Sequence, residues 1–246
     1  MVVRSYELLS VERTGHVATI TLNRPEKLNA LNPPLVAEFH AALDEIASEE
    51  DIRVVIVTGA GRGFCSGADV NRQLESLQGT ADPAPEGPGI TALAPHLQRI
   101  PQPVIAAING VSAGAGFGVA LASDIRIASE AARFSCIFAA RQGAAMEMAL
   151  TGSIYDAQWA LEKGLVNKVV PADRLLDAAM ELAQTIASNP PICVRSIKQL
   201  VHEHDGDIEN VLHLESAANA SAYCSEDRLE AVKSFLEKRE PVYKGR

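Results

Sequence analysis

Residues 103–124 read PVIAAINGVSAGAGFGVALASD, and the rest of the chain is interpreted outward from this stretch. It opens with an apolar, partly β-branched run, 104–108, which predicts a buried strand. Asn109-Gly110 ends the run, three glycines crowd the next turn, and 119–122 begins a small apolar helix. Such a turn leaves backbone N–H groups at the positive end of a helix dipole, where a phosphate or an oxyanion can bind. Alternatively, the glycines only permit close packing, and this stretch alone does not decide between the two.

The composition indicates a folded protein with an acidic balance. The chain has 246 residues, of which 47% are hydrophobic and 22% are charged, so it can bury a substantial core. A net charge of −9 argues against nucleic acid or an anionic membrane as a main partner. No apolar run is long enough to span a bilayer, and the N-terminal residues lack the apolar core of a signal peptide.

The cysteines and histidines do not suggest a metal site. The four cysteines lie far apart with no CxxC pair, and the six histidines lack ligand spacing. His202 and His204 are better explained as a solvated helix end. We therefore expect reduced thiols, no bound metal and a cytoplasmic protein.

The order of the expected elements predicts an α/β fold in two parts. Residues 8–13 and 16–22 predict a hairpin, and Asn32 is the expected cap of a helix that runs to about residue 48. Buried strands are expected at 54–57, 125–128 and 165–170, with helices between them. After residue 172 helices alone are expected, at 173–188, 190–204, 207–222 and 225–238. The expected division is 1–172 as the α/β core and 173–246 as a helical region.

The turn after the strand at 54–57 does not support a dinucleotide site. A GxGxxG motif that starts at Gly59 would need glycine at position 64, where Phe64 stands. No acidic residue ends a second strand about twenty residues further on, as ribose binding would require. The segment 78–89 is instead a Gly/Pro-rich loop.

Five segments, in the right order, carry a resemblance to one known family. They are ITLNRPEKLNALN (20–32), VVIVTGAGRGFCSGADV (54–70), PVIAAINGVSAGAGFGVALASDIRIAS (103–129), LTGSIYDAQWALEKGLVNKVV (150–170) and SEDRLEAVKSFLEKREPVYKG (225–245). On these segments the chain resembles the enoyl-CoA hydratase/isomerase (crotonase) family along essentially its whole length. The resemblance implies a crotonase-like spiral of ββα units and a helical C-terminal region that builds homotrimers, often paired into hexamers. It also implies an acyl-CoA or enoyl-CoA thioester as substrate, with no separate cofactor because coenzyme A is part of that substrate.

The resemblance also implies the position of an oxyanion hole. Members of this family bind the thioester carbonyl with two backbone N–H groups, which stabilise an enolate. In this sequence the matching residues are Ser66 in FCSGAD and Ala115 in SAGAGFG. Both lie beside glycines, so the backbone can approach a ligand closely. For Ser66 alone, the alternative is an ordinary turn hydroxyl.

Coenzyme A carries phosphates, which an acidic protein must meet with local positive charge. The resemblance places Arg24 and Lys27 against the nucleotide end. It gives Ala30 and the backbone of Ala68, Asp69 and Val70 as pantetheine and adenine contacts. On the last expected helix, Lys233, Lys238 and Arg239 could reach the phosphates of the same or a neighbouring subunit. For each lysine taken alone, a solvated surface role explains the sequence equally well.

The sequence departs from the family pattern at the expected acid/base groups. Hydratases of this family activate water with two glutamates, and the matching positions here are Gly118 and Phe138. Neither residue can donate or accept a proton, so hydration by the usual pair is not expected.

A second departure lies between Arg141 and Gln142, where the resemblance implies a further loop and helix. In isomerase-like relatives that piece carries a catalytic Asp. Either the piece is truly deleted, or residues are missing from the sequence. The second explanation is favoured, because a deletion would open the acyl pocket and leave apolar surface exposed.

Three functions remain open at this stage. The favoured one is double-bond isomerisation through an oxyanion-stabilised enolate, because isomerisation needs one acid/base group and no activated water. The second is a hydratase-family member of fatty-acid catabolism with weak hydratase activity. The third is a non-catalytic oligomer that binds acyl-CoA.

Overall fold

The computed structural model describes residues 6–80, 86–135, 143–203 and 225–246. The chain begins with the expected hairpin: β1 (Leu9–Thr14) pairs antiparallel with β2 (Val17–Leu22), and Thr14 opposes Val17 at the turn. Gly15 has a φ of +60°, which explains glycine at this tight connection. The hairpin is thus confirmed almost to the residue.

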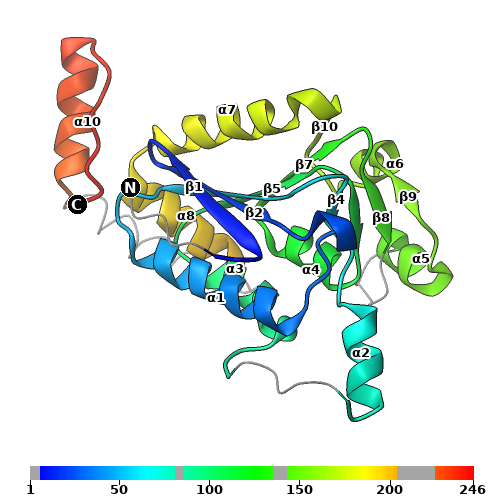
Figure 1. The fold of residues 1–246 in the computed structure, drawn as a ribbon. Helices are drawn as coiled ribbons and strands as arrows, with labels where there is room; N and C mark the ends of the chain where they lie inside the picture. The colour runs from blue at the N-terminus through cyan, green and yellow to red at the C-terminus, as the bar shows by residue number, and fades with distance from the viewer. Residues whose placement is uncertain (1–5, 81–85, 136–142, 204–224) are drawn as a thin grey trace.

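The hairpin forms one edge of a six-stranded sheet that runs through the molecule (Figure 1). The other strands are β3 (Val54–Gly59), β5 (Val104–Ile108), β7 (Ile125–Ser129) and β10 (Lys168–Val170). From β2 onward each neighbouring pair is parallel, in the order β1-β2-β3-β5-β7-β10. The four strands expected at 54–57, 104–108, 125–128 and 165–170 are all present, although the last is shorter than expected.

A second sheet is built from short strands that follow those of the first. It contains β4 (Gly63–Cys65), β6 (Val111–Ala113), β8 (Arg133–Ser135) and β9 (Tyr155–Asp156), in that order. Strand β4 is parallel to β6, and β6 is parallel to β8. Each repeat therefore places one strand in the large sheet and the next in the small sheet, followed by helix. The expected spiral of ββα units is confirmed.

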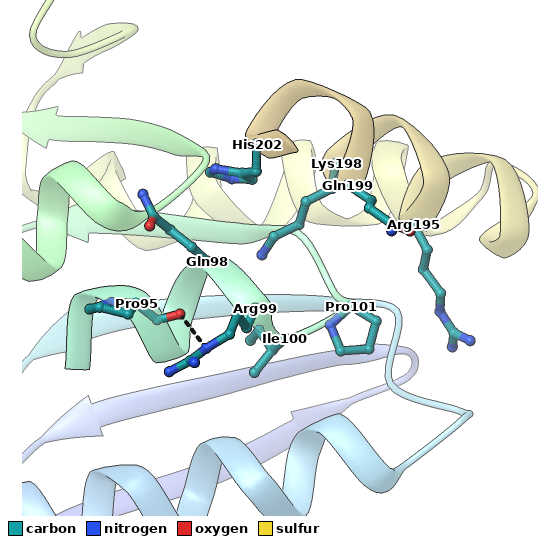
Figure 2. A pocket seen from close by; sticks show the side chains of 9 residues that line it. All are labelled: Pro95, Gln98, Arg99, Ile100, Pro101, Arg195, Lys198, Gln199 and His202. Carbon is teal, nitrogen blue, oxygen red and sulfur yellow. Dashed lines mark hydrogen bonds between the residues drawn. The ribbon is translucent and has the colours of Figure 1, made fainter. Parts of the chain in front are cut away.

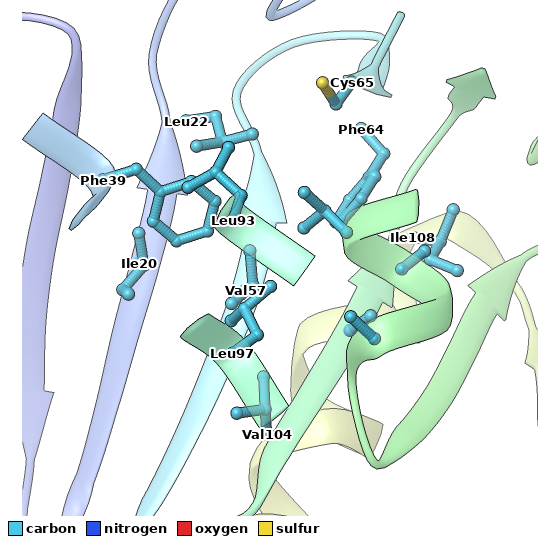
Figure 3. Close-up of a cluster of buried hydrophobic side chains, with 14 of the residues drawn as sticks. Ile20, Leu22, Phe39, Val57, Phe64, Cys65, Leu93, Leu97, Val104 and Ile108 are labelled. Carbon is cyan, nitrogen blue, oxygen red and sulfur yellow. The ribbon is translucent and has the colours of Figure 1, made fainter. Parts of the chain in front are cut away.

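Helices cover both faces of the large sheet. On one face lie α1 (Pro33–Ser48), α3 (Leu93–Arg99) and α4 (Ala115–Ala122), over a core that includes Phe39, Phe64 and Leu97 (Figure 3). On the other face lies α7 (Leu175–Ala187), whose small residues pack on β3, β5 and β7. Burial on both faces explains why the strands read as continuous apolar runs.

The remaining helices lie around this core. They are α2 (Val70–Leu77), α5 (Gly143–Thr151), α6 (Ala157–Glu162), α8 (Pro191–Glu203) and α10 (Glu226–Glu237), with short 3-10 helices η1 (Pro25–Lys27), η2 (Ile90–Ala92) and η3 (Ala172–Arg174). The helix expected at 207–222 lies outside the described residues, as does His204. The division at residue 172 stays a prediction, and the helical part after it begins with α7, which belongs to the core. No helix in the described ranges is both long and apolar enough to cross a bilayer.

Candidate functional site

The two glycine-flanked turns expected to form the site lie next to each other. The first follows β4 and contains Ser66, and the second follows β6 and contains Ala115. Because β4 and β6 are parallel neighbours, their carboxyl ends reach the same edge of the small sheet. The fold therefore brings together residues that are far apart in sequence.

Glycine contacts hold these turns close. Gly67 has a φ of +97°, and a Cβ added there would lie 2.9 Å from the Ala113 carbonyl oxygen and 3.4 Å from the Ala115 nitrogen. A Cβ added at Gly116 would lie 2.6 Å from both Cβ and Sγ of Cys65, and would collide with the Cys65 carbonyl oxygen. Any side chain at either glycine would push the turns apart, so close approach explains both glycines.

The two proposed oxyanion donors differ in their present hydrogen bonding. Ala115 is the first residue of α4 and follows Gly114, which has a φ of 51°. Among the residues that the structure describes, no acceptor is found for the Ala115 N–H, as expected for the first turn of a helix. The Ser66 N–H, by contrast, donates to the Leu28 carbonyl at 3.0 Å, and the Ser66 hydroxyl donates to the Lys27 carbonyl at 3.2 Å.

The loop before α1 holds the first turn in place. Leu31 N–H donates to the Gly67 carbonyl at 2.7 Å, and Asp69 N–H donates to the Leu31 carbonyl at 3.0 Å. Asn29 is fully buried with a φ of 56°, and its amide donates to the carbonyls of Ala60 and Gly63. Sequence reasoning missed Asn29, although an Asn in a position with positive φ is a recognisable turn signal.

Arg24 and Asp69 form an ion pair across the same loop. Arg24 donates to the Asp69 carboxylate at 3.0 Å and to the Ala30 carbonyl at 2.6 Å. Each of the two charged side chains is only 12% exposed. Their charges therefore neutralise each other, and the phosphate contact expected for Arg24 stays a prediction.

The other expected coenzyme A residues fall into two groups, one near the first turn and one at the end of the chain. Lys27 is exposed on η1, Ala30 is buried, and Ala68 and Val70 lie at and just beyond the first turn, with Val70 72% exposed. Lys233 and Lys238 are exposed at the end of the chain, on and after α10, which stands away from both sheets in Figure 1. Within one chain, the fold does not bring these two lysines to the turns.

A cavity of about 440 Å³ lies beside the first turn. It is lined by α1, the start of α2 and the segment 86–90, and both Ala68 and Asp69 contribute to its wall. Most of the other lining side chains are apolar, and His40 of α1 contributes a buried imidazole. The cavity is thus contiguous with the residues expected to meet the thioester substrate.

A second cavity, of about 580 Å³, lies between α3 and α8 (Figure 2). Its wall includes Arg99, Arg195, Lys198 and His202. Lys198 and His202 both contact the Asp124 carboxylate, at 3.0 Å and 2.6 Å. Figure 2 shows the Arg195 side chain directed away from Lys198, so the positive groups do not converge on one point.

The expected acid/base positions offer no proton-transfer group in the described structure. Gly118 lies within α4, and a Cβ added there would meet no atom within 4 Å. Phe138 and the Arg141–Gln142 junction lie outside the described residues. Across the described part of the chain, no three His, Cys, Asp or Glu side chains are placed to hold a metal ion.

The helix after the junction exposes apolar side chains. Leu150 of α5 and Ile154 just after it are 77% and 71% exposed, and Met146 is 41% exposed. The full sequence runs directly from Arg141 to Gln142. Loss of the piece and its absence from the sequence would both expose this apolar surface, so the favoured explanation, that residues are missing, stays a prediction.

Comparison with known proteins agrees with this architecture. The family model described as "Enoyl-CoA hydratase/isomerase" matches residues 12–141 and 139–246, so the two matched sections meet beside the Arg141–Gln142 junction. The chain is 36% identical to 1,2-epoxyphenylacetyl-CoA isomerase of Escherichia coli (strain K12), over 94% of this chain and 95% of the relative. It is also 36% identical to short-chain-enoyl-CoA hydratase of Clostridium acetobutylicum, over 93% and 94% of the two chains.

A solved structure shows the same fold. The crystal structure of enoyl-CoA hydratase from Bacillus anthracis superimposes with a TM-score of 0.88 at 35% identity, covering 98% of this chain and all of that chain. The match extends through both sheets and the helical region. The chain therefore belongs to the enoyl-CoA hydratase/isomerase (crotonase) family of acyl-CoA enzymes.

Proposed function

We propose that this protein binds an acyl-CoA thioester at the two turns and isomerises a double bond through an enolate. The observation that carries the proposal is the Ala115 N–H, which begins α4 beside the Ser66 turn and has no acceptor among the described residues. A backbone donor at a helix start stabilises negative charge on a carbonyl oxygen. It is fixed before substrate arrives, so no reorganisation is needed during reaction.

Ser66 supplies the second donor in this proposal, after a local change. Its N–H now donates to Leu28, a residue with a φ of 49°. A thioester oxygen would compete with the Leu28 carbonyl for this N–H. The bound substrate would therefore shift the loop before α1 slightly, and the Ser66 N–H would become available only in the complex.

Isomerisation is favoured over hydration because water activation requires positioned carboxylates. Gly118 has no side chain, and a Cβ added there would meet no atom within 4 Å. Moving a double bond requires only one group to remove and return a proton.

Coenzyme A would lie along the loop before α1 and the start of α2. In this proposal Lys27 meets the phosphates, while Ala30, Ala68 and Val70 line the pantetheine and adenine path. Arg24 and Asp69 contribute by keeping that path in shape, because each already holds the other. Lys233 and Lys238 would reach the phosphates only from a neighbouring subunit.

A homotrimer or hexamer would supply that neighbour. On α10, Leu229, Val232 and Leu236 are 58%, 49% and 74% exposed and recur at helical spacing. On α8, Ile197 and Val201 are 61% and 70% exposed. These apolar faces support association through the helical region.

The test is a comparison of three measurements on the purified protein. Coenzyme A thioester binding is measured by calorimetry, isomerisation with a 3-enoyl-CoA, and hydration with crotonyl-CoA. We expect the protein to bind the thioester and to isomerise the 3-enoyl-CoA. We expect its hydration of crotonyl-CoA to be slower by about 10²-fold or more than that of a hydratase with both glutamates. Binding without turnover would favour the non-catalytic alternative, and fast hydration would overturn the choice of isomerisation.

A further inference from the structure

Two histidines meet at the wall of the 440 Å³ cavity. His40 of α1 and His96 of α3 lie with their Nδ1 atoms 2.7 Å apart and their rings within 18° of parallel. His40 Nε2 lies 3.3 Å from the Gly89 carbonyl oxygen, and His96 Nε2 lies 3.1 Å from the Asp44 carboxylate. The four groups form one chain of three polar contacts, Gly89–His40–His96–Asp44.

This row of hydrogen-bonding groups has two protonation states, which differ by one hydrogen. Each contact needs one hydrogen, and neither the Gly89 carbonyl nor the ionised Asp44 carboxylate can supply one. All three hydrogens must therefore come from the two imidazoles. Two neutral imidazoles carry only two N–H hydrogens, so filling every contact requires exactly one additional proton on the pair.

The contact lengths indicate which contact is unfilled when the pair is neutral. A carboxylate is the stronger acceptor, so His96 donates from Nε2 to Asp44 and accepts on Nδ1. His40 then donates from Nδ1 to His96, which leaves its Nε2 lone pair facing the Gly89 oxygen. That contact, at 3.3 Å, is the longest of the three.

We propose that His40 and His96 form a proton-binding site. When this site is protonated, a hydrogen bond connects the cavity-wall segment 87–90 to α1. One proton taken up by the histidine pair fills all three contacts, and His40 Nε2 then donates to the Gly89 carbonyl. That carbonyl also accepts from Ala92 N–H at 3.0 Å and so caps η2. The proton therefore joins α1 to the start of η2 and, through His96, to α3.

The surrounding charges set the pH range of this uptake. Burial, opposed by the Asp44 carboxylate, lowers the pKa of His96 below the usual histidine range, and the charges of His40 and Arg99 lower it further. Proton uptake is therefore expected on the acidic side of neutrality. Three other charged groups line the neighbouring cavity. Asp69 pairs with Arg24, Arg72 pairs with Glu75, and Glu86 directly precedes the segment 87–90.

The site lies between two cavities. His40 lines the 440 Å³ cavity together with Ala68 and Asp69, and both histidines line a further cavity of about 350 Å³ together with Pro88 and Ala92. Forming or breaking the hydrogen bond to residues 87–90 therefore changes the wall of both cavities. This inference does not rest on the proposed enzymatic function, because it needs no thioester.

The test measures hydrogen exchange of peptides covering residues 86–92 in the full-length protein, expressed as protection factors between pH 8 and pH 5. In the wild type we expect protection to rise about tenfold on acidification, as a charge-assisted hydrogen bond shifts the local opening equilibrium. Wild-type protection that does not change with pH would overturn the proposal.

Three variants separate this site from general acid effects. His40→Gln should remove the pH dependence, since a glutamine amide can donate to Gly89 without titrating. Asp44→Asn should move the midpoint to lower pH, because Asn still accepts from His96 but carries no charge. Asp51→Asn is the matched control, since the side chains of Asp44 and Asp51 are each 75% exposed. An unchanged midpoint in Asp44→Asn would refute the site even if His40→Gln failed to fold.

Discussion

The guanidinium of Arg24 lies 3.0 Å from the carboxylate of Asp69, and the same guanidinium donates to the Ala30 carbonyl. Both residues were expected to contact coenzyme A, yet in the fold each is the partner of the other. The pair connects the loop before α1 to the turn that carries Ser66.

Breaking this pair should destabilise the fold as well as the site. Arg24→Gln and Asp69→Asn should each lower the free energy of unfolding by about 2 kcal/mol, because each leaves a mostly buried charge without its partner. In chemical denaturation the double variant should lose less than the sum of the two. Arg62→Gln, at an exposed arginine, is the control. If the two losses of unfolding free energy were strictly additive, the two residues would not be energetically coupled. If Arg24→Gln lost thioester binding at unchanged stability, a direct phosphate contact of Arg24 would be supported.

Proline at position 115 should remove one proposed donor and leave the helix intact. Ala115 is the first residue of α4, where proline is well tolerated because its missing N–H has no helical partner. Ala115→Pro should lower thioester turnover by about 10²–10³-fold, the usual effect of losing one oxyanion donor. Circular dichroism would check the helix, and Ser66→Ala, which keeps its N–H, should retain most activity. Full activity in Ala115→Pro would exclude this N–H from the reaction.

Two glycines of α4 should respond oppositely to alanine. At Gly116 the added methyl group would press on Cys65, so Gly116→Ala should destabilise the protein by about 3 kcal/mol. At Gly118 the methyl group meets nothing within 4 Å, so Gly118→Ala should stabilise it by about 0.5–1 kcal/mol through helix propensity. Thermal unfolding of both variants measures the contrast. Equal effects would show that the two turns are not packed as described.

The open space at Gly118 also permits a gain-of-function variant. Gly118→Glu places a carboxylate where hydratases of this family have one of their two glutamates. Crotonyl-CoA hydration should rise, up to about 10²-fold for one positioned acid/base group, while thioester binding stays similar. No change in hydration by a folded Gly118→Glu protein would mean that the site cannot position the attacking water.

The Cys65 thiol should be inert at neutral pH. Burial raises its pKa to about 12, although the Gly67 N–H partly opposes that shift. The fold therefore holds the proton more tightly than the unfolded chain does, so this stabilisation is present below about pH 9 and is lost as pH rises from there towards 12. Peptide mapping after alkylation at pH 8 should find Cys193 modified and Cys65 unmodified. Rapid modification of Cys65 in the native protein would contradict its burial.

Local sequence patterns determined most of the elements and the family. The hairpin, the Asn32 cap and the long apolar strands follow from periodicity and turn chemistry, which act over a few residues. The ββα spiral was implied by the family resemblance that the five motifs carry. The short strands β4 and β6 were not expected, because three residues carry too little periodic signal.

Only the tertiary structure decided which partners the functional residues have. The sequence placed Arg24 and Asp69 in two motifs and gave each a role towards substrate, but their mutual contact spans 45 positions. Likewise, nothing local relates Gly116 to Cys65, or His40 to His96. These pairings depend on which strands lie side by side and which helices cross. The physical reason is that side-chain chemistry is encoded residue by residue, whereas contacts at long sequence separation arise from burying both faces of one sheet at once.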